Sequence, residues 1–549
     1  MTTLYILLLL DTGGVYARSS WLLQLAALAY LLWRVFQRGM LRLPKRWVAL
    51  ETVLIAVGVI LSAVTGVDTG ESLYGVIRML TACAMLFALC QCTAEEKEAL
   101  LGQIPYIGLG MAALSALAGS VGFLRNWVSV TGRLAGAFEY PNTMALFLLL
   151  GIVILERSEK RGGLLCQALL CGCILLTGSR TVFVVLCAYL AYRLYRRKKA
   201  GLVLLLAALV LVILLLHFFN IETVADRFLT LSLSSSTLQG RLLYWEDALR
   251  MLWKYPLGLG YMGYFYMQQL MQTGVYSVRF VHNDWLQLAL DYGLLTAAGV
   301  LLWLCRRLRG AKLAEWKKEL LVLTGLCSLF DFHLQYWGIV LIVLLPLSET
   351  FPVEERPVTK VWKYGISGAA LVTTALSGIL LAAGWYAGQE DYDSALMWDP
   401  ISTEYLAGRM LQAADLEEGA YYAEKILERN ALYYAAYEIR SNARASGGDV
   451  KGFVADRKTV LSLRKYEIEE YEEYIQILYS LYVNAEAENA DDADACLAAL
   501  AEVPELISEV KKATSLRAFQ IQDIPQLELG NEYESLIEIL TGGEETCNR

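Results

Sequence analysis

The stretch GRLAGAFEYPNTMALFLLLGIVILERSEKR, residues 132–161, contains a polar segment, an apolar run and a cluster of charges, in that order. The apolar run, residues 137–155, has about the length and the composition of a membrane-spanning helix. The basic loop ERSEKR, residues 156–161, is expected in the cytoplasm under the positive-inside rule. Arg133 in the polar segment and Asn142 near the start of the apolar run are therefore expected towards the outer side of a membrane.

Further apolar runs predict that this helix is one of about twelve spans. They lie at residues 20–37, 48–65, 72–92, 100–121, 163–178, 180–195, 201–219, 285–305, 318–334, 336–349 and 365–386. Hydrophobic residues make up 56% of the chain and charged residues 19%, which excludes a single soluble core and indicates a polytopic membrane protein. The first residues, MTTLYILLLL, are too few to span, and we interpret them as the tail of a first span, packed obliquely or continued upstream.

Charge divides the chain into two parts. From Glu390 onward there are 33 acidic and 14 basic residues, a net charge of −19, whereas the preceding residues have a net charge of +11. We expect a polytopic membrane domain over residues 1–389 and an acidic extracytoplasmic domain over residues 390–549. Helical Tyr/Ala patterns recur roughly every thirty residues in the second part, which predicts a soluble helical-repeat (TPR-like) domain suited to a partner protein. An irregular helical bundle is the alternative.

The longest polar stretch of the first part, residues 220–284, is expected to form an external catalytic loop. Within LQGRLLYWEDALRMLWKYP, residues 238–256, four apolar residues recur at helical spacing: Leu242, Trp245, Leu249 and Leu252. Pro256 ends the pattern, so we predict an amphipathic helix against the outer leaflet. The tyrosines of the following LGLGYMGYFYM suit sugar rings and interfacial anchoring alike.

His282 is one of three histidines in the chain, and it lies where this loop meets the next span. It could cap that helix, although Asn283 and Asp284 are better caps. The positive N-terminal end of the helix would keep the imidazole neutral, as a general base requires. We therefore predict that His282 is a catalytic base, that His217 is structural and that His333 supports the site.

Arginines on the outer side are the second candidate group. Arg133, Arg180 and Arg241 suit bidentate binding of a diphosphate, with lipid headgroup anchoring as the alternative. The outer loops have no Asp-rich metal motif, and the chain has no zinc-type clustering of His and Cys. We therefore expect no metal and no cofactor.

Four motifs, GRLAGAFEYPNTMA, LTGSRTVF, GRLLYWEDALRMLWKYPLGLGYMGY and VHNDWLQLALDYGLL, follow one another on the expected outer side. Together they resemble the O-antigen ligase and polymerase family of bacterial membrane glycosyltransferases, over roughly residues 70–345. The resemblance implies a GT-C-like helical fold and metal-independent transfer of a glycan from a polyprenyl-diphosphate carrier at the outer face of the inner membrane. The site residues that it implies are His282 as the base for an acceptor hydroxyl, Arg180 and Arg241 as diphosphate ligands, and Arg133 and Asn142 as further substrate contacts.

A single direct displacement would invert the anomeric centre. The expected partners are the lipid-linked glycan donor, a glycan, lipid or protein acceptor and membrane lipids, with no nucleic acid. Because ligases and polymerases share the donor site, the sequence is compatible with either activity. Two alternatives come from other classes: a flippase or transporter, for which Glu51 and Asp291 are the main deeply placed ionisable residues, and a membrane scaffold that presents the outer domain.

Overall fold

The computed structural model describes residues 2–44, 50–119, 129–156, 163–197, 235–310, 312–485 and 489–542. This part of the chain is almost entirely helical, with two short two-stranded sheets, β1–β4 (Met40–Pro44 with Val353–Pro357) and β2–β3 (Ser129–Val130 with Arg133–Leu134). The predicted all-α class is confirmed.

The helices of the membrane part follow the predicted apolar runs. They are α1 (Thr2–Leu10), α2 (Ala17–Arg38), α3 (Leu50–Thr65), α4 (Thr69–Cys90), α5 (Ala94–Leu101), α6 (Ile104–Gly119), α8 (Pro141–Leu155), α9 (Gly163–Thr177), α10 (Arg180–Arg197), α13 (Ser236–Lys254), α14 (Gly263–Met271), α15 (Asp284–Gly310), α16 (Glu315–Cys327), α17 (Trp337–Ser348) and α18 (Lys360–Ala387). Within the described ranges, five helices are long and apolar enough to cross a membrane, and further apolar helices are shorter. The predicted run 201–219, the first residues of the external loop and His217 lie outside the described residues.

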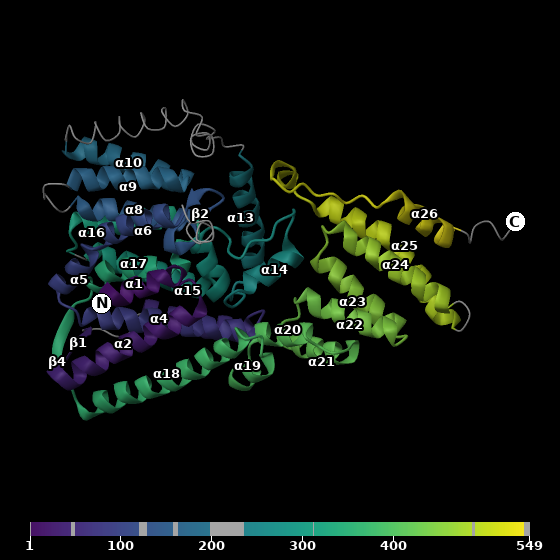
Figure 1. The fold of residues 1–549 in the computed structure, drawn as a ribbon, viewed down its shortest axis with the longest axis horizontal. Helices are drawn as coiled ribbons and strands as arrows, with labels where there is room; N and C mark the ends of the chain where they lie inside the picture. Colours follow the sequence, from purple (N-terminus) through teal and green to yellow (C-terminus); the bar gives the residue numbers. More distant parts are fainter. Residues whose placement is uncertain are drawn as a thin grey trace.

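Most of these helices lie side by side, and α13 crosses their ends (Figure 1). Asn142 at the start of α8, Thr177 at the end of α9 and Arg180 at the start of α10 lie near α13. The opposite end contains the β1–β4 sheet (Figure 1), and ion pairs join helices there. Arg193 of α10 contacts Glu319 of α16 at 2.9 Å, and Arg306 of α15 contacts Glu51 of α3 at 2.6 Å.

A break in α15 anchors the polar loop that follows α13. Gly293 has a φ of +81°, and its own position allows no side chain, because a Cβ there would lie 2.4 Å from the carbonyl oxygen of Leu257. The loop uses the backbone groups at this break: the amide of Leu259 donates to the carbonyl of Leu290 (2.6 Å), and the amide of Leu294 donates to the carbonyl of Pro256 (2.9 Å). The loop is therefore hydrogen-bonded into a helix of the membrane part.

Helix α13 ends at Lys254, two residues before Pro256, as predicted. Its face towards the protein consists of Leu243, Ala248, Met251 and Leu252. Within the predicted apolar pattern, Leu252 is buried against the protein, whereas Leu249 is exposed together with Trp253, four residues further on. The placement of this helix against the outer leaflet stays a prediction.

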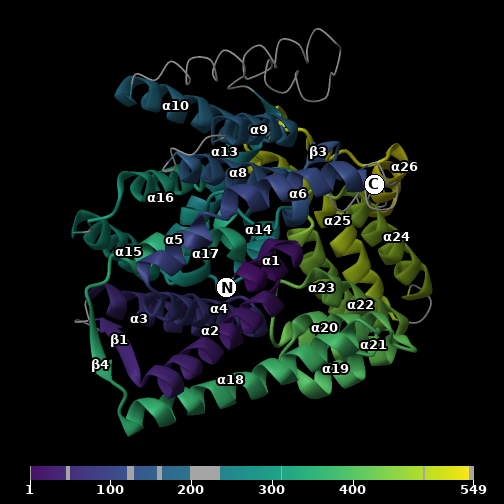
Figure 2. The same ribbon diagram turned by 60° about the vertical axis from the view of Figure 1, so that its left-hand side comes forward.

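The C-terminal part consists of further helices. They are α19 (Tyr392–Trp398), α20 (Thr403–Leu411), α21 (Leu416–Leu427), α22 (Tyr434–Ser446), α23 (Val450–Leu463), α24 (Ile468–Ala485), α25 (Ala490–Ala513), a short 3₁₀ helix η4 (Leu516–Gln520) and α26 (Asn531–Thr541). Helix α18 runs along one edge of the membrane part and leads into them (Figures 1 and 2). The TPR-like character of these helices stays a prediction.

The C-terminal part contacts the α13 end of the membrane part. The amide of Asn430 donates to Asp68 at 3.2 Å, in a buried contact beside the start of α4. The ammonium of Lys465 donates to the carbonyl of Leu270 at 2.9 Å, at the end of α14. The two parts therefore meet on the side where the predicted site residues lie.

Candidate functional site

Asp331 lies at the centre of the predicted site, in the turn between α16 and α17. One of its carboxylate oxygens is 3.1 Å from Nδ1 of His282, and the other is 3.1 Å from a guanidinium nitrogen of Arg241. The side-chain amide of Asn142 donates to the Asp331 carboxylate at 2.7 Å, and the hydroxyl of Tyr140 donates to it at 2.8 Å. A single buried carboxylate therefore joins the predicted base to one predicted diphosphate ligand and to one further predicted substrate contact.

The charge of Asp331 is fixed by these neighbours. Burial alone would raise the pKa of its carboxyl, but the Arg241 guanidinium and the His282 hydrogen bond outweigh burial and hold the pKa well below its usual range. An ionised carboxylate can only accept hydrogen bonds, so Nδ1 of His282 is the donor. In a neutral imidazole the lone pair then lies on Nε2, the nitrogen that a general base needs.

The backbone at His282 is strained and well supported. Its φ of +54° is rare for a residue with a side chain and costs on the order of 1–3 kcal/mol. The neighbouring amide of Val281 donates to the side chain of Gln287 at 2.9 Å. Asn283 caps α15, because its side-chain oxygen accepts from the amides of Trp285 (3.0 Å) and Leu286 (3.1 Å). The prediction that Asn283 and not His282 is the cap is confirmed, and the imidazole is instead bonded to Asp331.

Arg133 extends the network away from Asp331. It donates to the side-chain oxygen of Asn142 at 2.8 Å and to the carbonyl of Thr177 at 2.7 Å. The amide group of Asn142 therefore bridges Arg133 and Asp331, accepting from one and donating to the other.

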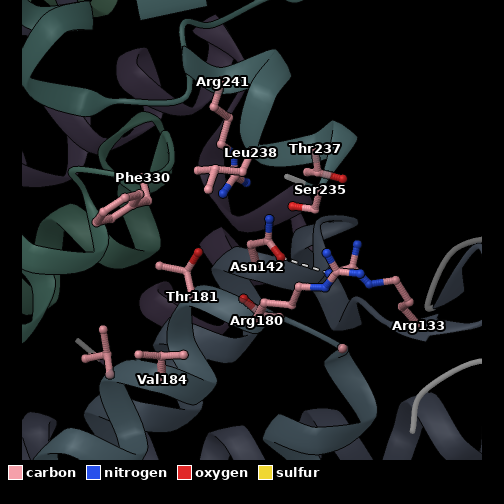
Figure 3. A pocket seen from close by; sticks show the side chains of 13 residues that line it. Arg133, Asn142, Arg180, Thr181, Val184, Ser235, Thr237, Leu238, Arg241 and Phe330 are labelled. Atoms are coloured by element: carbon pink, nitrogen blue, oxygen red, sulfur yellow. Dashed lines mark hydrogen bonds between the residues drawn. The ribbon is translucent and has the colours of Figure 1, made fainter. Parts of the chain in front are cut away.

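A cavity of about 470 Å³ lies beside this network. Its lining consists of Arg133, Asn142, Gly178, Ser179, Arg180, Thr181, Val184, Val185, Ser235, Thr237, Leu238, Arg241 and Phe330. In Figure 3, the side chains of Arg133 and Arg180 extend towards Asn142, whereas Arg241 reaches the cavity from α13. The three predicted arginines thus border one cavity, which combines positive charge with apolar walls.

His282 is not among the lining residues of this cavity. It borders a second cavity of about 230 Å³, which shares Thr237 and Arg241 with the first. The sequence predicted that the base and the arginines share a single pocket. They share one hydrogen-bonded network instead, and Arg241 faces the cavities on both sides.

Residues 165–301 match the family model described as O-antigen ligase. This part of the chain is similar to O-antigen ligases. The matched range includes Arg180, Arg241 and His282, whereas Arg133, Asn142 and Asp331 lie outside it. The match supports, at family level, a membrane glycosyltransferase of the ligase or polymerase type, and that family uses a lipid-linked glycan donor and an acceptor. Several apolar helices of the described residues are compatible with a protein that crosses the membrane more than once. No curated protein matches the chain.

His333 lies behind the candidate site. Its Nδ1 lies 3.1 Å from the hydroxyl of Thr143, and burial lowers the pKa of the imidazole to about 4, so this ring is neutral near pH 7. The ring of Phe332 packs edge-on against His282, with centroids 5.0 Å apart, and stacks on Tyr140 at 4.7 Å. The turn at residues 331–333 therefore supplies a charge, a ring contact and a buried polar contact to the site.

Sequence reasoning missed Asp331. It lies in FDFHLQYW, two residues before His333, in a short polar interval between two apolar runs. An ionisable residue at such a place, on the expected outer side, is itself a functional signal. That signal was present in the sequence, but the contacts with Arg241 and Asn142, far away along the chain, were not.

The two residues on which a transporter would depend have other surroundings. Glu51 lies in the first turn of α3 and pairs with Arg306 near the end of α15. Asp291 is buried within α15, where its carboxylate accepts from the side-chain amide of Gln287 at 2.8 Å. Neither residue belongs to the network around Asp331.

Proposed function

We propose that this protein transfers a glycan from a polyprenyl-diphosphate carrier to a hydroxyl group of an acceptor at the outer face of the bacterial inner membrane. The observation that carries the proposal is the Asp331 carboxylate, which contacts both His282 and Arg241 at 3.1 Å. Because His282 and Arg241 contact the same buried carboxylate, the proposed base and the proposed diphosphate ligand are held in place relative to each other.

The larger cavity suits the diphosphate and the first part of its lipid. Three guanidinium groups border it, and a guanidinium can bind two oxygens of a diphosphate at once, while Asp331 holds that of Arg241 in place. Val184, Val185 and Leu238 line other parts of the cavity and suit an isoprenoid chain. We assign the stabilisation of the departing diphosphate to these arginines, and transfer is expected to continue in the presence of EDTA.

In the proposed reaction, Nε2 of His282 accepts the proton of the acceptor hydroxyl while its oxygen forms a bond to the anomeric carbon. The bond from that carbon to the diphosphate oxygen breaks, and its electron pair leaves with the diphosphate, whose charge Arg180 and Arg241 stabilise. Asp331 stays ionised and stabilises the imidazolium that forms. Attack opposite the leaving group inverts the anomeric centre, and the separate cavities beside His282 and beside the arginines are consistent with this approach.

The first test is glycan profiling of a strain that lacks the gene. Accumulation of full-length unattached chains would indicate a ligase, and accumulation of single repeat units would indicate a polymerase. Wild-type protein should restore the normal profile, and His282→Ala should not. A normal profile with His282→Ala at equal protein abundance would refute the assignment of the base.

The second test addresses the diphosphate ligands. Arg241→Lys keeps the charge but loses the two-pronged contact, so transfer from a polyprenyl-diphosphate-linked oligosaccharide in membranes should fall about 10- to 100-fold. Arg250→Lys is the matched control, because Arg250 lies on the same helix α13 and is half exposed, with its contact directed to Asp247. Equal rates for both variants would count against the diphosphate site.

A further inference from the structure

The second cavity has walls from both parts of the chain. The membrane part contributes Ser236, Thr237, Gly240, Arg241, Tyr244, Val275 and His282, and the C-terminal part contributes Ile521, Gln522 and Asp523. More than 230 residues separate His282 from Ile521 along the sequence, so this cavity exists only when the C-terminal part is docked.

Polar contacts fix the segment that carries these three residues. The amide of Ser515 donates to the carbonyl of Thr273 at 2.9 Å. The guanidinium of Arg517 donates twice to Glu246 of α13, at 3.0 and 2.8 Å, and also donates to Gln239 of the same helix. Arg517 thus binds the outward side of the helix that carries Arg241.

Apolar contacts seat the same segment. Ile521 is buried against Leu243 and Tyr276 in one hydrophobic cluster. A Cβ on Gly274 would lie 2.7 Å from the Cβ of Ala518, so the close approach of the segment depends on a glycine at residue 274. Residues 521–523 are therefore held at the cavity by contacts with α13 and with residues 273–276.

We propose that this cavity is the acceptor subsite, that it takes the hydroxyl-bearing end of a saccharide, and that the C-terminal domain builds one of its walls. The inference rests on the proposed function, because His282 borders the cavity as the base that would deprotonate the acceptor.

The lining suits a neutral sugar. The side chains of Gln522 and Asp523 are exposed, and an amide and a carboxylate are the groups that bind sugar hydroxyls. Tyr244 adds an aromatic ring, which packs against Tyr276 in a tilted arrangement with a centroid distance of 4.5 Å. With about 230 Å³, the cavity is smaller than the roughly 300–1,000 Å³ of sites for drug-sized ligands, and so fits a single sugar ring.

The charges at the cavity also favour a neutral sugar. Arg241 is already paired with Asp331, and Asp523 adds a negative charge, so an anionic group would be repelled here. Burial raises the pKa of the Tyr244 hydroxyl, Arg241 lowers it and Asp523 raises it, with a net rise. The hydroxyl therefore stays protonated and can donate to a sugar oxygen.

Saturation-transfer NMR on the full-length protein in detergent tests this inference with a panel of p-nitrophenyl monosaccharides as probes. Wild-type protein should saturate the sugar protons of at least one probe. Asp523→Asn should raise its Kd about tenfold, because hydrogen bonds to charged groups are the stronger ones, and Gln522→Ala should raise it by a smaller factor. Glu528→Gln, at an exposed position of the same stretch, is the control and should bind as wild type does.

A charge swap tests the wall itself. Arg517→Glu should weaken saccharide binding because it repels Glu246, and the double variant Glu246→Arg with Arg517→Glu should restore it. Wild-type protein that binds none of the probes, or Asp523→Asn that binds with an unchanged Kd, would overturn the proposal.

Failure of the proposed function has a different signature. Arg180→Lys should weaken binding of polyprenyl diphosphate and leave saccharide binding unchanged, because Arg180 lines only the larger of the two cavities. Full transfer by His282→Ala would refute the base while the saccharide Kd still reports on the subsite.

Discussion

Two buried aspartates lie near the outer loop, and their surroundings differ. Asp331 contacts a guanidinium and an imidazole, and these hold the pKa of its carboxyl well below the usual range. Asp247, on α13, accepts from the amide and the hydroxyl of Thr273 (3.0 and 2.9 Å) and from the hydroxyl of Tyr276 (2.9 Å). Burial raises the pKa of Asp247, and these hydrogen bonds and the half-exposed Arg250 offset that rise only in part.

Asp331 joins the residues of the candidate site, whereas Asp247 holds a loop in place. The partners of Asp331 border cavities on both sides, so its charge acts on groups that a substrate can reach. The main partners of Asp247 are neutral groups of the loop itself, which it ties to α13. Burial is common to both residues, and only the charge and accessibility of the partners distinguish them.

The largest effect is expected from Asp331→Asn. An amide cannot stabilise an imidazolium, and it can present a donor to Nδ1 of His282, so the rate of glycan transfer should fall about 10²- to 10⁴-fold. The measurement is transfer from a polyprenyl-diphosphate-linked oligosaccharide in proteoliposomes, with the apparent Tm as the control for folding. A rate within a few-fold of wild type would remove the distinction between the two aspartates.

A smaller effect, on stability, is expected from Asp247→Asn. The variant loses one acceptor for the buried donors of Thr273 and Tyr276, which should cost about 1–3 kcal/mol of folding free energy. The apparent Tm should fall by several degrees, while transfer at a temperature where the variant is folded should stay close to wild type. A large loss of transfer with an unchanged Tm would give Asp247 a role in the site.

The smallest effect is a difference in pH dependence. Because the folded pKa of Asp331 is lowered, its stabilising contribution is present above the unfolded pKa of about 3.9 and is lost as the pH falls below it. Asp247 has a raised folded pKa, so its contribution decreases as the pH rises from about 3.9 through the folded value.

Apparent Tm values between pH 6 and pH 3 should therefore diverge. Compared with wild type, Asp331→Asn should lose less stability on acidification, and Asp247→Asn should lose more. Parallel curves for the two variants would show that the environments of the two carboxyl groups do not differ in the way described.

Hydropathy and charge were enough to predict most of the helices, because each span is specified by its own residues. The same local signals predicted the end of α13 near Pro256 and the cap at Asn283. His282 and the arginines were proposed as site residues because charged and titratable groups are few between the spans on the expected outer side. The role of Asp331 could not be read in this way, since it depends on partners from α8, α13 and the start of α15.

The C-terminal part gives a second example of what a linear pattern omits. Its acidic charge and helical character were predicted, but the ion pair between Arg517 and Glu246 of α13 was not. A single ion pair between exposed-looking residues has no signature in hydropathy or period. The face of α13 that the protein covers was not predicted either, because neighbouring helices and not the helix itself decide which apolar residues are covered.

The break at Gly293 has a consequence for where in the bilayer the loop can work. Non-helical backbone is costly in hydrocarbon unless the protein itself satisfies it. Here the amides of Leu259 and Leu294 have carbonyl partners across the break, so the loop can sit at the depth of the lipid headgroups without relying on water. A carrier phosphate could then be used where it already resides, without being lifted out of its leaflet.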